Sequence, residues 1–113
     1  MSQITTHILD TSIGMPASGV PVHLSKSAGT NGWDIISEGV TNDDGRIPGL
    51  VDKDTMLAPG RYKLHFDTAV YFERQKIKGF YPYVEVVFEI TSTKHHHVPL
   101  LLNPFGYSTY RGS

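Results

Sequence analysis

The sequence predicts an all-β domain, in the form of a β-sandwich or a small barrel. Apolar and polar residues alternate with a period of two in several runs, and in residues 61–67 the side chains of Tyr62, Leu64 and Phe66 share one face. Such alternation gives a strand one side for the core and one for water, as antiparallel sheets prefer. Turn sequences separate eight short runs of this kind, which is typical of a sandwich.

Four strands are expected in the first half of the chain, at residues 4–11, 20–26, 33–40 and 46–50. The turn sequences GMPASG, SAGTNG and NDDG stand between them, and each combines glycine with small or polar residues. In the second run, valine and leucine at positions 20, 22 and 24 alternate with proline, histidine and serine.

Four further strands are expected at residues 61–67, 83–91, 95–102 and 105–111. Every even position from 84 to 90 is apolar, which marks the core face of that strand. The last run alternates bulky with small residues almost to the final position, whereas chain ends usually fray. We therefore expect the terminal carboxylate of Ser113 to be held in place.

Residues 69–78 (AVYFERQKIK) interrupt the strand pattern, and one short helix is expected there. The segment lacks alternation and contains glutamate, arginine, glutamine and lysine. Thr68 precedes it as a possible N-cap, and Gly79 stands where a helix would end.

Composition narrows the classes of function. The 113 residues suit a single domain, 1–113, and the 39% of apolar residues can form a core. The net charge of −1 gives no electrostatic reason to expect a nucleic-acid or membrane partner. The absence of cysteine excludes disulfides, thiolate nucleophiles and cysteine-bound zinc. No secretory pattern or long apolar run is seen, so a cytoplasmic location is expected.

Histidine and arginine residues are the candidates for chemistry. On a strand, His95 and His97 point to one face and His96 to the other, so two imidazoles about 7 Å apart could share a ligand or a metal. A solvated strand end is the alternative interpretation of this triplet. His7 lies on the first strand, on the face opposite its apolar neighbours, and Arg46 follows a tight turn.

Five segments together resemble a known family. They are TTHILD at 5–10, TNDDGR at 41–46, FYPYVEV at 80–86, HVPLLL at 97–102 and YSTYRGS at 107–113. The chain resembles the transthyretin-like family, and within it the 5-hydroxyisourate hydrolases, over essentially all of its length. The terminal YRGS is the most specific of these signals, because it distinguishes the hydrolases from the hormone-carrying transthyretins.

The resemblance implies a fold and an assembly. The expected fold is a transthyretin-like (prealbumin-like) β-sandwich of two four-stranded antiparallel sheets with one short helix near 69–78. Members of this family are homotetramers, built as dimers of dimers, with active sites in the channel between dimers. The family occurs in several compartments, so the peroxisome is the alternative to the cytoplasm.

The resemblance also implies a reaction, the hydrolysis of 5-hydroxyisourate to 2-oxo-4-hydroxy-4-carboxy-5-ureidoimidazoline in urate (purine) degradation. It needs no cofactor and no metal. The catalytic residues would be His7, Arg46, His97 and Ser113, with the histidines activating water and Arg46 acting as an electrostatic clamp. Which histidine takes the proton is left open. The substrate-binding residues would be His7, Arg46, His95, Tyr110, Arg111, Gly112 and Ser113.

Two alternatives are kept. The chain could be a non-enzymatic carrier of a small aromatic ligand, bound in the same channel between subunits. A zinc ion could also bind His7, His95 and His97, since three imidazoles and a water form a known ligand set. Such zinc would be incidental to the reaction.

Overall fold

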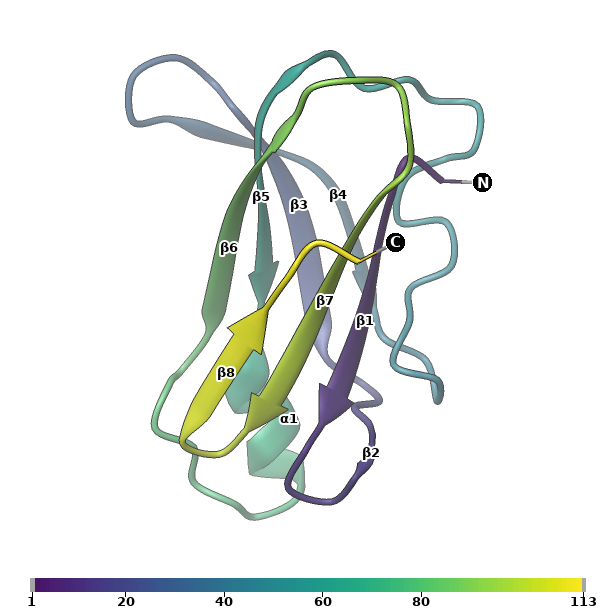
Figure 1. The fold of residues 1–113 in the computed structure, drawn as a ribbon. Coiled ribbons are helices and arrows are strands. Elements are labelled where there is room, and N and C mark those ends of the chain that lie inside the picture. Colours follow the sequence, from purple (N-terminus) through teal and green to yellow (C-terminus); the bar gives the residue numbers. More distant parts are fainter. Residues whose placement is uncertain (1, 113) are drawn as a thin grey trace.

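Two four-stranded sheets face each other in the computed structural model, which describes residues 2–112 (Figure 1). One sheet has the strand order β2-β1-β7-β8 and the other β4-β3-β5-β6. The elements in chain order are β1 (Ile4–Asp10), β2 (Met15–Pro16), β3 (Pro21–Ser27), β4 (Trp33–Val40), β5 (Gly60–Phe66), α1 (Thr68–Arg74), β6 (Val84–Ile90), β7 (His96–Asn103) and β8 (Gly106–Thr109). The predicted transthyretin-like sandwich is confirmed.

The prediction of antiparallel sheets is wrong for one strand pair. β1 and β7 run parallel, with Thr5 beside His97 and His7 beside Pro99, while the strand pairs of the other sheet are antiparallel. Alternation reports which face of a strand is buried and carries no information on its direction. β1 and β7 lie far apart in the sequence, so no hairpin turn forces them to be antiparallel.

The predicted strand at 46–50 is not formed. Only Arg46 pairs with a strand, through an isolated bridge to His7, and turns follow it. Pro48 lacks the backbone N–H that a strand needs, and Gly49 has a φ of +74°. The fourth member of the first sheet is instead the two-residue β2, which pairs Leu9 with Pro16 and lies inside a segment expected to be a turn.

The helix is shorter than the predicted span of 69–78. Asp67 occupies the N-cap position without a side-chain hydrogen bond, and Thr68 is the first helical residue instead of the cap. The helix ends before Gly79 because Lys76 adopts a φ of +58°, the left-handed conformation usual just after a helix. In residues 2–112 no helix is long and apolar enough to cross a membrane.

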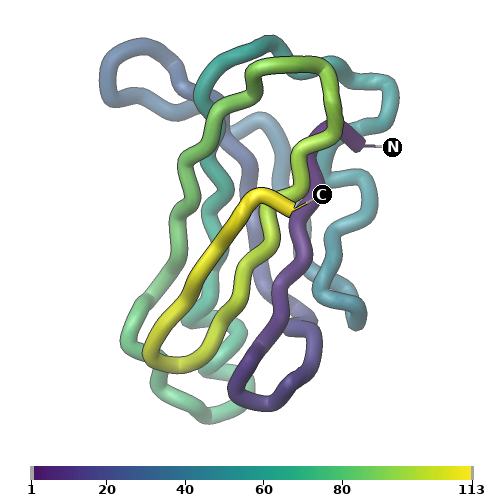
Figure 2. The backbone as a smooth tube through the Cα atoms, in the orientation of Figure 1, coloured from purple at the N-terminus to yellow at the C-terminus, as the bar shows by residue number. Residues whose placement is uncertain are grey.

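The core lies between the sheets and determines which side chains face outward. Tyr62, Leu64 and Phe66 of β5 are fully buried, as the alternation predicts. Ile8 of β1 and Leu100 of β7 meet them from the other sheet and are equally buried. The intervening residues of β1 and β7 therefore lie on the outer face of the first sheet. After β8 the tail continues in the direction of that strand and then bends toward β7 (Figure 2), where Gly112 bridges His97 beside the beginning of β1.

Candidate active site

The parallel pairing of β1 and β7 brings three candidate residues to the outer face of the first sheet. Residues paired in parallel strands point to the same side, so Thr5 and His97 are neighbours on this face and His7 lies two positions further along β1. All three are half-buried, whereas Thr6 and Val98 between them are buried. The predicted placement of His7 and His97 on the outward faces of their strands is confirmed.

Thr5 joins two histidines through one hydroxyl group. Its Oγ1 lies 2.6 Å from Nε2 of His95 and 2.7 Å from Nδ1 of His97. The centroids of the two imidazole rings are 6.1 Å apart, so the expected pair on one face is present. Thr5 is not among the residues that the sequence patterns single out, although it lies two positions from His7 and therefore on the same face of that strand.

The turn before Arg46 positions this residue beside His7. The side-chain oxygen of Asn42 accepts hydrogen bonds from the backbone N–H groups of Asp44 and Arg46, at 2.9 and 3.1 Å. The Gly45 carbonyl accepts one from Ile8 N–H, at 2.9 Å. Gly45 has a φ of +73°, and a Cβ there would collide with the Ile8 carbonyl oxygen. Only glycine therefore lets this turn approach β1 so closely.

The tail approaches the same site from the other side. Gly112 N–H donates to the carbonyl of His97 at 2.8 Å, and the two residues form an isolated antiparallel bridge. A Cβ on Gly112 would lie 2.5 Å from Cδ2 of His97, so only a glycine backbone packs this closely against the imidazole ring. Ser113 lies outside the described residues.

Tyr110 and Arg111 are exposed, and they lie beside a cavity that is not lined by His7, Arg46 or His95. They line a volume of about 340 Å³ together with His97 and with Val86 and Phe88 of β6. The structure thus brings together His7, Arg46, His95, His97 and Gly112. Of these residues, only His97 also lines the cavity beside Tyr110 and Arg111.

The surroundings of His97 favour its neutral form. Burial lowers the pKa of His97 below its usual value, and the positive charges of Arg46, His95 and His7 lower it further. Arg46 lines one cavity together with Thr5, whose hydroxyl contacts both His95 and His97. A half-buried, neutral imidazole beside an arginine can accept a proton near neutral pH.

The proposed zinc site is not found. Within residues 2–112, no group of three histidine, cysteine, aspartate or glutamate side chains is arranged to hold a metal ion. Instead, His95 and His97 each direct one ring nitrogen at the hydroxyl of Thr5.

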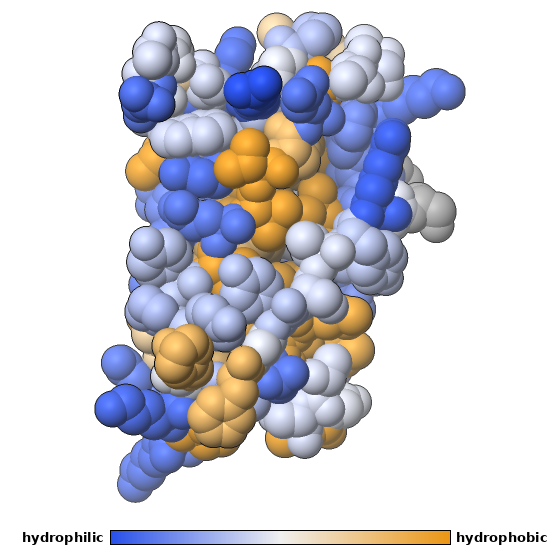
Figure 3. Space-filling view, turned by 60° about the vertical axis from the view of Figure 1, so that its left-hand side comes forward, coloured by the Kyte–Doolittle hydropathy of each residue, from blue (hydrophilic) through white to orange (hydrophobic). Residues whose placement is uncertain are grey.

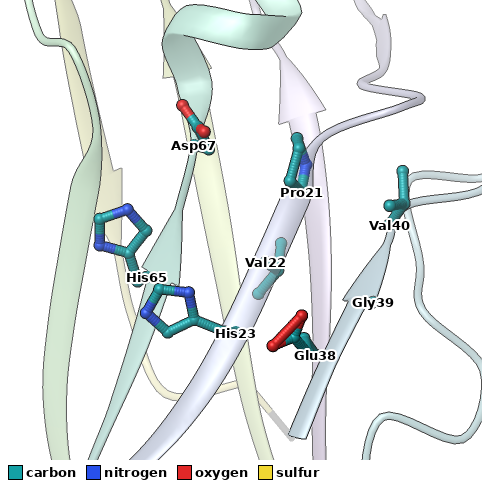
Figure 4. Close-up of a pocket in the computed structure, with 8 residues that line it drawn as sticks. All are labelled: Pro21, Val22, His23, Glu38, Gly39, Val40, His65 and Asp67. Atoms are coloured by element: carbon teal, nitrogen blue, oxygen red, sulfur yellow. The ribbon is translucent and has the colours of Figure 1, made fainter. Parts of the chain in front are cut away.

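A second histidine pair lies on the opposite side of the sandwich (Figure 4). His23 and His65 stack with ring centroids 4.5 Å apart beside a cavity of about 310 Å³. Glu38 and Asp67 also line this cavity, and it has no arginine. Acidic side chains disfavour an oxygen-rich or anionic ligand, so the site around His97 is the better candidate for such a molecule.

Residues 4–112 match the model of the HIUase/transthyretin family. The chain belongs to this family. Its relatives in the family include the 5-hydroxyisourate hydrolase of Mus musculus, which is 50% identical over 99% of this chain and 96% of its own length. The 5-hydroxyisourate hydrolase of Salmonella typhi is 47% identical over 97% of this chain and 80% of its own length.

Solved structures of both branches of the family share the fold. Sea bream transthyretin in complex with thyroxine has a TM-score of 0.90 and 33% identity, over 97% of this chain and 94% of its own. The 5-hydroxyisourate hydrolase of Klebsiella pneumoniae has a TM-score of 0.85 and 39% identity, over 100% and 94%. The fold therefore does not distinguish hydrolase from carrier, and the distinction rests on the side chains of the site.

Proposed function

We propose that this protein hydrolyses 5-hydroxyisourate to 2-oxo-4-hydroxy-4-carboxy-5-ureidoimidazoline, a step of urate degradation. The observation that supports this most strongly is the meeting of His7, Arg46 and His97 on one outer sheet face, from three separate segments of the chain. The 50% identity with the mouse enzyme of that name supports the same substrate.

The proposed chemistry is an attack of water on a ring carbonyl. His97, neutral because of its lowered pKa, accepts a proton from the water, and His7 orients that water. The water oxygen bonds to the carbonyl carbon, the ring C–N bond breaks, and the imidazolium returns its proton to the leaving nitrogen. Arg46 stabilises the charge that develops on the carbonyl oxygen, for which its paired N–H donors are suited.

The other predicted site residues are His95 and the residues of the tail. Ser113, which follows Gly112 in the sequence, would act with its hydroxyl or its carboxylate. His95, Tyr110 and Arg111 would bind substrate together with these residues. Only side chains and water take part, so a chelator should leave turnover unchanged.

A carrier function is less well supported. Transthyretin of sea bream binds thyroxine in its solved structure and matches this fold closely. A carrier of an aromatic ligand, however, has no use for a neutral imidazole held beside an arginine. The polar side chains of this site therefore favour the hydrolase.

The decay of 5-hydroxyisourate absorbance tests the proposal directly. Substrate prepared freshly from urate and urate oxidase is mixed with wild type, with His97→Ala and with His23→Ala as a matched control on the opposite sheet. Wild type and His23→Ala should accelerate the decay far above the spontaneous rate, and His97→Ala should not. A folded wild type that leaves the spontaneous rate unchanged would refute the function.

We also propose that the protein is a homotetramer, built as a dimer of dimers. β6 and β8 are edge strands on the same side of the sandwich, so their backbone groups are free to pair with another copy. Apolar surface is exposed on that side, between polar residues (Figure 3), and Phe80 and Phe105 are among the most exposed apolar residues. Light scattering after size exclusion should give four times the mass of one chain.

A cytoplasmic location, with the peroxisome as the alternative, stays a prediction.

A further inference from the structure

The hydroxyl of Thr5 limits the protonation states of two histidines at once. Both His95 Nε2 and His97 Nδ1 lie within hydrogen-bond distance of Oγ1, at 2.6 and 2.7 Å. A hydroxyl carries one proton, so it can donate to only one of these nitrogens. At least one imidazole must then donate its own N–H to Oγ1. The proton positions on the two rings are therefore coupled.

Two arrangements of protons satisfy both hydrogen bonds while the Thr5 hydroxyl donates its own proton to one of the two rings. In one, His95 donates to Thr5 and Thr5 donates to His97, so the other nitrogen of His97, Nε2, carries a proton. In the other, His97 donates through Nδ1, Thr5 donates to His95, and Nε2 of His97 keeps a free lone pair. Only the second arrangement leaves His97 able to accept a proton at Nε2.

The charges around the site favour the second arrangement. Arg46 bridges His7 and lines one cavity together with Thr5, and its charge acts on the ring of His97. A lone pair is more stable than an N–H bond near a positive charge. His95 then carries its proton on Nδ1. That side chain is half-exposed, so its N–H can donate to solvent at little cost.

We propose that Thr5 is a positioning residue, whose hydroxyl accepts a hydrogen bond from Nδ1–H of His97 and donates one to Nε2 of His95, and so holds His97 in the tautomer that can act as the base. The role rests on the proposed hydrolase function and extends it. When Nε2 takes a proton from water, the hydroxyl stabilises the resulting imidazolium by accepting the N–H of Nδ1. His95 supports the arrangement from the far end of the chain of hydrogen bonds.

Three variants separate this role from a merely structural one. Thr5→Val removes the hydroxyl and keeps the branched shape, whereas Thr5→Ser keeps a hydroxyl at this position. Thr11→Val is the matched control. It removes a hydroxyl just after β1 that donates to the Leu102 carbonyl and not to a histidine. With 5-hydroxyisourate, kcat of Thr5→Val should fall by about tenfold or more while KM changes little. Thr5→Ser and Thr11→Val should both stay within about threefold of wild type.

Nitrogen-15 NMR of the histidine rings provides a readout that does not depend on activity. Wild type should show His97 protonated at Nδ1, and Thr5→Val should lose this preference while its thermal unfolding stays cooperative. Wild-type kcat in Thr5→Val, or a proton on Nε2 of His97 in the wild type, would overturn the proposal. An inactive wild type with the expected NMR signature would instead refute only the hydrolase function, because the hydrogen-bond chain is present in either case.

Discussion

At the scale of single residues, the surroundings of His97 determine the pH range in which its imidazole is neutral. Burial and the charge of Arg46 both disfavour the imidazolium, so the pKa of His97 is below its usual value near 6.5. The residue therefore stays neutral, and able to act as a base, at a pH where an exposed histidine is already protonated.

The first prediction concerns pH. If His97 is the base, kcat/KM should decline on the acid side with a midpoint below about 6.5, since a lowered pKa keeps the active neutral form present to lower pH. Removing the charge in Arg46→Gln should move the pKa of His97 upward, measured by NMR titration of its ring protons. An acid limb centred above the usual histidine value would contradict this assignment.

At the scale of elements, two connections position the site and link it to the rest of the fold. The 42–46 turn touches β1 through Gly45, and α1 touches the end of β1 through Tyr71, whose hydroxyl donates to the Asp10 carboxylate at 2.7 Å. Asp10 and Tyr71 are both buried. Each connection predicts a separate effect of mutation.

Gly45→Ala should damage both stability and turnover. The added Cβ would collide with the carbonyl of Ile8, so the turn carrying Arg46 must move away from β1. Gly14→Ala is the matched control, because Gly14 has a similar φ of +67° and no atom within 4 Å of the added Cβ. Strain alone should cost Gly14→Ala about 1 kcal/mol in urea unfolding. Gly45→Ala should cost about 3 kcal/mol and reduce kcat. Equal losses in the two variants would show that the close approach is unimportant.

Alkaline unfolding should report on Tyr71. Burial and the hydrogen bond to the Asp10 carboxylate raise the pKa of Tyr71 to about 12, above its usual value of 10.0. Because the folded state holds this proton more tightly, its contribution is complete below pH 10 and is lost as the pH rises toward about 12. The urea midpoint of wild type should therefore fall over this range. Tyr71→Phe should be less stable at pH 8 by about 2 kcal/mol and lack this decline.

The same elements show how far the sequence could predict the structure. Alternation located most strands and the outward placement of His7 and His97, because burial is a local property of a strand. The parallel pairing of β1 with β7, and the contact of Thr5 with both histidines that depends on it, could not be predicted, since it is set by packing between segments far apart in the chain. The end of the helix could not be predicted, because Lys76 takes a left-handed conformation that sequence patterns assign to glycine.

At the scale of the whole molecule, the tail lies against the candidate site through Gly112 and contributes little to the core. Within the described residues, Gly112 joins the sheet through its bridge to His97 alone, and Tyr110 and Arg111 before it are exposed. Deleting residues 110–113 should therefore abolish turnover and leave the far-UV circular dichroism spectrum nearly unchanged. A truncated chain that is folded and fully active would refute any role for the tail in the reaction.

The pairing of β1 with β7 also has a consequence for how the protein folds during its synthesis. Thr5 and His97 are 92 positions apart, so the two strands can meet only after most of the chain has been synthesised. Such distant pairings are slow to form, on a scale of about milliseconds to seconds. During translation β1 therefore stays unpaired with β7 until residues 96–103 have been made. A nascent chain therefore lacks the juxtaposition of Thr5 and His97, and the edge of β1 that will pair with β7 is open to other strands until β7 has been made.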